Sequence, residues 1–171
     1  MEIRVLGPFE VVVDSQPCPI PGAAERELLA RLALSPGTVV AADRLVDDLW
    51  GERLPADAAN ALQTRVSKVR RALARSGVDP DALATQRPGY VLRVPRSAVD
   101  ALRFADLITE ARRAAERDAA TQAHATYAQA LALWRGPALA DFSSSRAASA
   151  VAQVDEKSAS AGPRQSARAS A

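Results

Sequence analysis

One stretch constrains this chain more than any other: residues 57–75 predict a single amphipathic helix whose two faces differ in chemistry. At about 100° per residue, its apolar side chains fall within about 40° of one another and form a narrow seam. These side chains are Leu62, Val66, Val69 and Leu73. Asp57 stands where its carboxylate can accept hydrogen bonds from the free N–H groups that open a helix. The seam requires a protein core, whereas the polar and basic face opposite suits an anionic partner.

Charge is distributed unevenly along the chain, although the formal net charge is only +2. Residues 1–59 carry five basic and ten acidic side chains, whereas residues 60–97 carry eight basic and two acidic ones, a local balance of +6. Such a local excess is typical of a polyanion-binding surface. It fits a solvated helix face equally well, so charge alone leaves both interpretations open.

Composition narrows the class of protein. The 171 residues suffice for one or two small domains, and because 48% are apolar but only 4% aromatic, the core must be built largely from Leu, Val and Ala. The single cysteine, Cys18, excludes an intrachain disulfide and is interpreted as a small apolar residue. The sequence shows neither a secretory leader nor an apolar run of membrane-spanning length. We therefore expect a cytoplasmic, nucleoid-associated protein that makes no contact with a membrane.

The sequence also lacks the parts of a catalytic or metal site. His124 has no Cys, Asp or Glu partners at ligand spacing, which favours a surface residue. Paired carboxylates, a nucleophile beside a base and a glycine-rich phosphate loop are all missing from the sequence pattern. We expect neither an enzyme nor a bound cofactor or metal.

Hydrophobic periodicity predicts the order of the secondary structure. Residues 3–13 and 83–94 each predict two short strands, the second pair joined by a turn at Pro88-Gly89. Three predicted helices lie between them, in residues 23–34, 41–50 and 57–75. Trp50 is in phase with the apolar residues of the second helix and is interpreted as a core anchor. Strands, three helices and a hairpin in this order are typical of a winged helix-turn-helix.

Five stretches then resemble one known family, in the right order and with short spacings. They are IRVLGPFEV, DRLVDDLWG, AANALQTRVSKVRRAL, RPGYVL and ALALWRGPALAD. Together they resemble the Streptomyces antibiotic regulatory protein family of transcriptional activators. The resemblance implies that residues 1–96 form a winged-helix domain of the OmpR type, with a four-stranded sheet ahead of the helices. The expected fold class is α+β: a small N-terminal antiparallel sheet, three helices and a C-terminal β-hairpin wing, followed by an α-helical, tetratricopeptide-like segment.

Two positions depart from the family pattern. Ala41-Ala42 stands where the family commonly opens the second helix with a hydroxyl residue. Ala24-Glu25-Arg26 replaces a Lys-Gln-Arg-like start of the first helix. These departures bear on one helix cap and one phosphate contact, and they leave the predicted fold unchanged.

The polar face of the third helix supplies the candidate DNA-binding residues. In a helix-turn-helix, the start of the recognition helix meets base edges in the major groove and its flanks meet phosphates. The direction of that face alone selects Asn60, Thr64, Ser67 and Arg71. The resemblance adds Gln63, Arg65 and Lys68. In the wing, Arg87 resembles an arginine that the family places in or beside the minor groove, and Thr85 is a candidate phosphate contact.

Chemistry separates these candidates into roles. Arg65 is the preferred base contact, because a guanidinium group can grip guanine at two points. Asn60 and Gln63 suit adenine or phosphate equally well. Lys68 and Arg71 are favoured as phosphate contacts.

A second unit follows in residues 97–142. Its periodicity predicts one helix over residues 99–117, with Asp100 as a cap, and another over residues 119–135, with Trp134 on its apolar face. A pair of this length has the size of one tetratricopeptide repeat, and it resembles the opening of the bacterial transcriptional activator domain.

Residues 143–171 change in character. They hold eight Ser and nine Ala and no aromatic residue, so this Ala/Ser-rich tail is expected to be disordered. Because a single repeat cannot bury its own face, we expect the activator domain to be truncated.

The leading hypothesis is a sequence-specific transcriptional activator of secondary-metabolite and antibiotic biosynthesis genes. The resemblance implies that it binds double-stranded DNA at direct-repeat promoter sites, with self-association on DNA and RNA polymerase as its protein partner. Two alternatives remain open: a DNA-binding protein that no longer activates and acts as an occluder, and a winged-helix module whose basic face binds an acidic protein.

Overall fold

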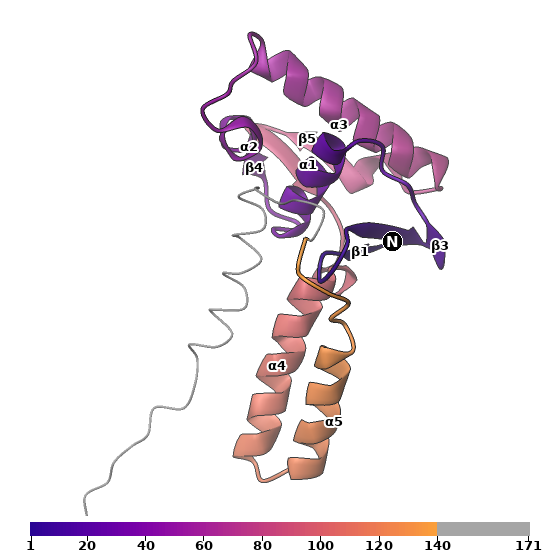
Figure 1. Ribbon diagram of the computed structural model, residues 1–171, viewed down its shortest axis with the longest axis vertical. Coiled ribbons are helices and arrows are strands. Elements are labelled where there is room, and N and C mark those ends of the chain that lie inside the picture. The colour runs from indigo at the N-terminus through magenta and orange to yellow at the C-terminus, as the bar shows by residue number, and fades with distance from the viewer. Residues whose placement is uncertain (140–171) are drawn as a thin grey trace, which may run out of the picture.

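The structure, a computed structural model, describes residues 1–139 and begins with a small antiparallel sheet (Figure 1). Its strands are β1 (Glu2–Arg4), β2 (Glu10–Val13) and β3 (Gln16–Pro17), in the order β1-β2-β3. Ile3 lies opposite Val11, and both side chains are buried. Among the described residues this sheet has three strands, so the expectation of four is wrong; Val99 adds only an isolated parallel bridge to Ile3.

Three helices pack over this sheet and enclose the main core. They are α1 (Ala23–Ala33), α2 (Ala42–Trp50) and α3 (Ala58–Arg75). The core side chains are large and almost fully buried, among them Leu28, Leu29, Leu32, Leu45 and Leu62. Burying one such side chain contributes roughly 1.5–3 kcal/mol, so this core holds the unit together. Cys18 is buried too, as the sequence predicted for a small apolar residue.

A second sheet forms the wing. Its strands are β4 (Val40–Ala41), β5 (Leu83–Gln86) and β6 (Gly89–Leu92), in the order β4-β6-β5, and a 3₁₀ helix (Pro80–Ala82) precedes β5. A Cβ atom at Gly89 would collide with the carbonyl oxygen of Val40, so only glycine fits there. The carbonyl oxygen of Pro88 accepts a hydrogen bond from the N–H of Ala42 at 3.1 Å. The wing therefore satisfies one free amide at the start of α2, where no side chain caps the helix.

A helical hairpin follows the wing. It consists of α4 (Asp100–Glu116) and α5 (Ala120–Leu131), after a 3₁₀ turn (Arg96–Ala98). The second helix ends at Leu131, so its predicted extension to residue 135 is wrong. Trp134 consequently lies beyond the helix and is 42% exposed; its ring centroid lies 6.0 Å from that of Phe104, in an edge-to-face arrangement.

Asp100 joins the hairpin to the N-terminal sheet rather than capping α4 from outside. It is the first residue of α4, and its side chain is only 2% exposed. Its carboxylate accepts hydrogen bonds from the backbone N–H groups of Val5 at 2.7 Å and Leu6 at 3.0 Å. Burial raises the pKa of this carboxyl group, while these amides, that of Ala101 and the nearby Arg135 act in the opposite direction.

Arg135 makes a second connection at the same place. Its backbone N–H donates to the carbonyl oxygen of Leu6 at 2.8 Å, and its guanidinium donates to the carbonyl oxygen of Pro8 at 3.1 Å. The guanidinium also pairs with Glu10 at 3.0 Å. Leu139, which is 1% exposed, follows and closes this junction.

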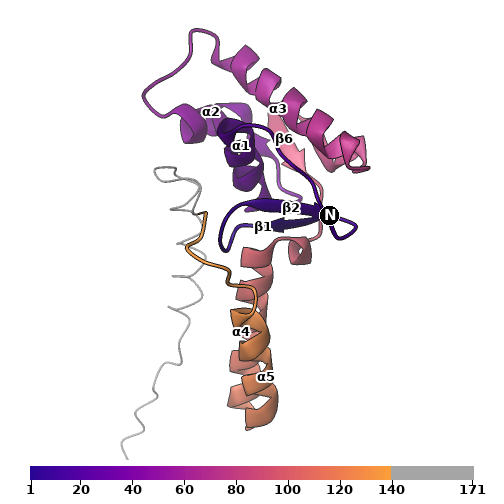
Figure 2. The same ribbon diagram turned by 45° about the vertical axis from the view of Figure 1, so that its right-hand side comes forward.

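The two units point in opposite directions. In Figures 1 and 2, α3 lies at one end of the molecule, the α4–α5 hairpin projects from the other, and the N-terminal sheet lies between them. The predicted fold class, an α+β winged helix-turn-helix followed by a helical segment, is confirmed. The predicted tail in residues 143–171 lies outside the described residues.

Candidate nucleic-acid interface

The third helix carries the candidate interface, and its own sequence explains its two faces. Asp57 caps it as predicted, because the carboxylate oxygen Oδ1 accepts a hydrogen bond from the N–H of Asn60 at 2.9 Å. The predicted seam is buried, with side-chain exposures of 3% or less at Leu62, Val66, Val69 and Leu73. The seam thus fixes the helix to the core and turns the polar face outward.

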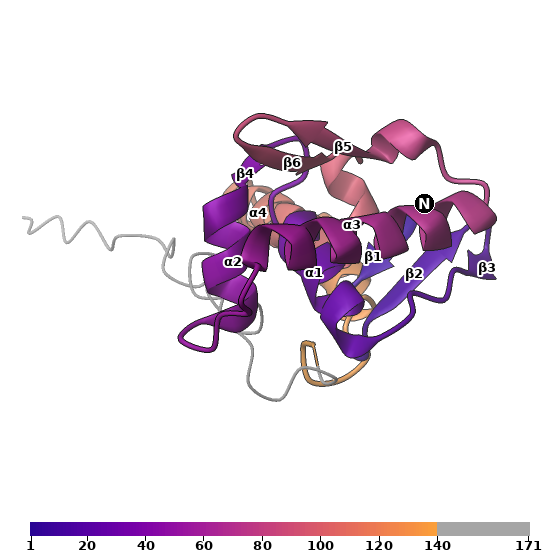
Figure 3. The same cartoon turned by 90° about the horizontal axis from the view of Figure 1, so that it is seen from above.

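Six of the sequence-predicted residues meet on that outward face. Asn60, Gln63, Thr64, Ser67, Lys68 and Arg71 are all exposed along α3. Seen from above, α3 crosses the open face of the unit with the β5–β6 hairpin along one side (Figure 3). Helix and hairpin therefore lie side by side.

The wing is tied to α3 by a residue that the sequence did not single out. Arg70 donates from Nε to the carbonyl oxygen of Leu83 at 2.8 Å and from Nη2 to Oγ1 of Thr85 at 2.9 Å. Thr85 and Arg87, the two predicted wing residues, are exposed on β5 and at the adjoining turn. The position of Arg70 at the border between the two faces of the helix was the available signal.

Arg65 differs from the other predicted residues on α3. The others are exposed, whereas Arg65 is half-buried on the flank of the helix. Its guanidinium carbon lies 3.9 Å from the centroid of the Trp50 ring. Burial lowers the pKa of the guanidinium, and the carboxylates of Glu25 and Glu27 oppose that shift. Trp50 packs at the edge of the core, as expected for an anchor. The sequence did not reveal that the Arg65 guanidinium also stacks on its ring.

Lys68 is held by the first helix. Its ammonium lies 3.1 Å from a carboxylate oxygen of Glu25, a side chain that is 8% exposed. Lys68, Arg71 and Arg75 line a hollow of about 350 Å³ beside the start of α1. Glu25, one of the residues that departs from the family pattern, therefore orients a basic residue of α3.

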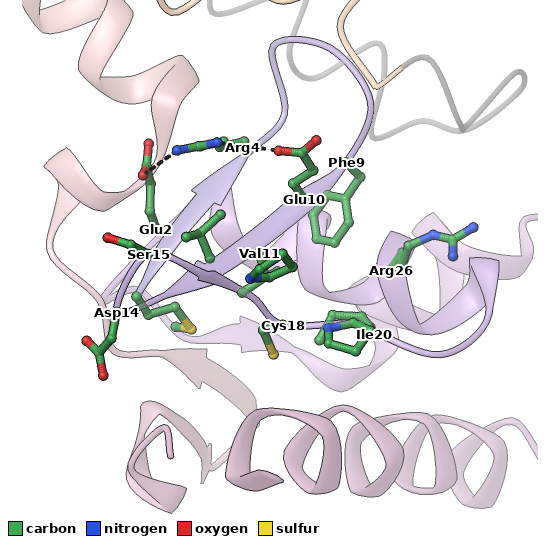
Figure 4. A pocket seen from close by; sticks show the side chains of 14 residues that line it. Glu2, Arg4, Phe9, Glu10, Val11, Asp14, Ser15, Cys18, Ile20 and Arg26 are labelled. Carbon is green, nitrogen blue, oxygen red and sulfur yellow. Dashed lines mark hydrogen bonds and ion pairs between the residues drawn. The ribbon is translucent and has the colours of Figure 1, made fainter. Parts of the chain in front are cut away.

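A larger hollow lies on the N-terminal sheet, away from this surface. It measures about 700 Å³, and its floor includes Val11 and Cys18 (Figure 4). Two guanidinium groups line it, those of Arg4 and Arg26, and that of Arg4 is paired with Glu2 at 3.0 Å and Glu10 at 3.5 Å. Because these carboxylates line the hollow too, it differs in charge from the basic face of α3.

Other kinds of site find little support in residues 1–139. No group of three or more His, Cys, Asp or Glu side chains in this part of the chain is placed to hold a metal ion. None of its helices is both long and apolar enough to cross a bilayer. His124 is exposed on α5, as its isolation in the sequence predicted.

An outward polar helix, supported by two others and flanked by a tethered hairpin, defines a winged helix-turn-helix DNA-binding protein. Comparison with known proteins agrees with this class. Residues 21–92 match the family described as transcriptional regulatory protein, C terminal, and residues 99–169 match the bacterial transcriptional activator domain.

Individual relatives share the same combination. The chain is 37% identical to the regulatory protein DnrI of Streptomyces peucetius over 147 residues, covering 82% of this chain and 54% of the relative. It is 32% identical to the transcriptional regulator RedD of Streptomyces coelicolor, covering 92% of this chain and 45% of that one. The structure of Mycobacterium tuberculosis EmbR, solved with a low affinity phosphopeptide, superposes with a TM-score of 0.84 at 33% identity, covering 91% of this chain and 42% of EmbR.

The chain therefore belongs to the Streptomyces antibiotic regulatory protein family, whose members join a winged-helix DNA-binding domain to a bacterial transcriptional activator domain. Both matched domains are domains of transcriptional regulators. The chain spans about half the length, or less, of these relatives.

Proposed function

We propose that this protein is a sequence-specific activator of secondary-metabolite and antibiotic biosynthesis genes, with α3 in the major groove and the wing at the minor groove. One observation carries the proposal: the exposed polar and basic face of α3 stands beside a wing that Arg70 holds in place. A major groove about 12 Å wide accepts one α-helix, and the exposed residues of α3 have the donors and acceptors that base edges and phosphates require.

The residues divide by chemistry and by position along α3. Asn60, Gln63 and Thr64 occupy the first half of the helix, the part that approaches base edges in a helix-turn-helix, and Ser67 follows on the same face. Lys68 and Arg71 supply phosphate contacts from the second half. In the wing, Arg87 approaches the minor groove, and the Thr85 hydroxyl can donate to a phosphate while it accepts from Arg70.

The number of copies that bind one site follows from the size of the unit. One winged helix spans few base pairs, so useful specificity requires two copies on one duplex. By analogy with the family, we propose direct-repeat promoter sites, self-association on DNA and RNA polymerase as the protein partner. The match of residues 99–169 to an activator domain supports activation.

Selection of bound duplexes from a random pool tests DNA recognition and supplies the site. Gel shifts with that site then compare the wild type with the double variant Lys68→Ala/Arg71→Ala. About six phosphate contacts correspond to a slope near −5 for log affinity against log salt, so removing two should reduce the slope by about 2. The matched control is Arg113→Ala/Arg117→Ala, which removes equal charge from exposed positions at the far end of α4.

Two outcomes would replace the proposal with one of the alternatives. Unchanged mobility of every duplex at low salt would reject DNA binding and favour a module for an acidic protein. Binding that lowers transcript yield from the selected promoter, in a reconstituted transcription assay with RNA polymerase, would favour an occluder over an activator.

A further inference from the structure

We propose that Arg65 is a positioning residue of the DNA interface: stacked on Trp50, it sets α3 against α2, and its exposed neighbours read the bases. This inference rests on the proposed DNA binding through α3. It reverses the role that the sequence favours for Arg65, since a free guanidinium would be the best base contact on the helix.

The geometry of the stack is the first argument. The Arg65 guanidinium carbon lies 3.9 Å from the centroid of the Trp50 ring, well inside the roughly 6 Å over which a cation is attracted to an aromatic face. Trp50 is the last residue of α2, and Arg65 lies in the second turn of α3. The contact therefore joins the two helices of the helix-turn-helix on either side of their connection in residues 51–57.

The surroundings of the guanidinium are the second argument. Its Nη1 atom is buried and has no hydrogen-bond partner among the described residues, so this end of the side chain faces protein and not the groove. Carboxylates of α1, at Glu25 and Glu27, add attraction. Groups from α1 and α2 thus act on one side chain of α3, and a base contact would require Arg65 to leave all of them.

The exposed neighbours are the third argument. Thr64, one residue before Arg65, and Gln63 both project from α3 without such a partner from α2. They can approach base edges without giving up a contact inside the protein. Their angle to the groove depends on how α3 is set against α2, which is what the Arg65–Trp50 stack determines.

Base-resolved selection separates positioning from base reading. For Arg65→Ala, we expect binding to the selected site to fall about tenfold while the selected sequence stays the same. Arg65→Lys should restore little, because it keeps the charge and loses the planar stack. Loss of preference at one base pair, with the other positions unchanged, would show a base contact and overturn the inference.

The partner on α2 supplies a second test. Trp50→Leu should weaken binding as Arg65→Ala does, and the double variant should be no weaker than either single one, because all three lack the same contact. Additive losses would show that the two residues act independently and would contradict the proposal. Trp50→Phe retains an aromatic face, should bind nearly as well as the wild type, and guards against misfolding of Trp50→Leu; circular dichroism checks all variants.

Fluorescence reports whether the stack persists on DNA. The chain has two tryptophans, so Trp134→Phe leaves Trp50 as the only tryptophan, which can be excited selectively at wavelengths where tyrosine does not absorb. We expect its emission to stay constant when the selected duplex is added. If the duplex instead changes the emission to that of the Arg65→Ala protein, Arg65 has left the Trp50 ring for DNA. That result would overturn the inference. If the wild type binds no duplex at all, the proposed function fails together with it, whereas these other outcomes leave DNA binding intact.

Discussion

The winged-helix unit and the α4–α5 hairpin are built from different side chains. The core of the first consists of large residues such as Leu28, Leu45 and Leu62, none more than 1% exposed. The buried surface of the hairpin is mostly alanine, for example Ala111 and Ala114. Because alanine buries little apolar area, the hairpin gains less from packing than the winged-helix unit does.

Because the hairpin gains less stability from its own packing, its attachment to the winged-helix unit matters more. Asp100 and Arg135 connect the hairpin to the loop that follows β1, Asp100 through buried hydrogen bonds and the Arg135 guanidinium through an exposed one. The winged-helix unit is stabilised by its own core. The hairpin, which packs less apolar area, depends on the junction to hold it in one orientation.

The largest effect is expected in the winged-helix core. Leu62→Ala should lower the free energy of unfolding by about 3 kcal/mol, because it removes a fully buried side chain and leaves a cavity behind α3. Urea unfolding followed by circular dichroism measures it. Leu131→Ala is the matched control in the hairpin: that side chain is 65% exposed, so a change within about 0.5 kcal/mol is expected. Equal losses from both would contradict the contrast between the units.

The junction should rank second. Asp100→Ala leaves the amides of Val5 and Leu6 without their acceptor in a buried place, which should cost about 2 kcal/mol. Asp106→Ala, on the same helix, removes an exposed carboxylate that pairs with Arg96, and should change stability by no more than about 0.5 kcal/mol. Thermal unfolding of both variants compares their midpoints. Indistinguishable midpoints would show that Asp100 does not stabilise the junction.

A smaller effect is expected at Arg135. Arg135→Ala loses the bonds to Pro8 and Glu10 and should destabilise the chain by about 1 kcal/mol, with DNA affinity unchanged. Hydrogen exchange should become faster around residues 5–10 and leave α3 protected. Arg113→Ala, on the exposed face of α4, controls for the lost charge. Weaker DNA binding would show that the hairpin supports the interface directly.

The smallest predicted effect is a pH dependence from Asp100. Its pKa is raised above the ordinary value of 3.8, so the folded state holds this proton more tightly than the unfolded state. The resulting stability is fully present below that value and is lost as pH rises through the raised pKa. Relative to Asp100→Asn, the wild type should therefore lose stability as pH rises through this window in urea titrations. A gain with pH would mean that the amides and Arg135 outweigh burial.

Much of the fold could be predicted because local patterns and tertiary packing agree. The seam of α3, its Asp57 cap and the glycine of the wing turn each follow from periodicity or from turn chemistry. The end of α5 was predicted too late, because the pattern of apolar residues continues to Trp134 after the helix stops. Backbone contacts to Leu6 take over there, and no periodicity reveals them.

The exposed face of the site followed from helical phase, whereas the contacts that orient it did not. Asn60, Ser67 and Arg71 lie outward as the phase predicts. Helical phase places Arg70 at the border between the two faces, but it does not identify the partners: Arg70 binds Thr85 and Arg65 stacks on Trp50, each pair 15 positions apart along the chain.

Titration of isotope-labelled protein with a duplex that carries the selected repeat tests the central claim most directly, with amide chemical shifts as the readout. We expect the shift changes to concentrate between Asn60 and Arg71 on α3 and between Thr85 and Arg87 in the wing, while the amide signals of α4 and α5 keep their positions. Shifts confined to the hairpin or to the N-terminal sheet, with α3 unchanged, would contradict it.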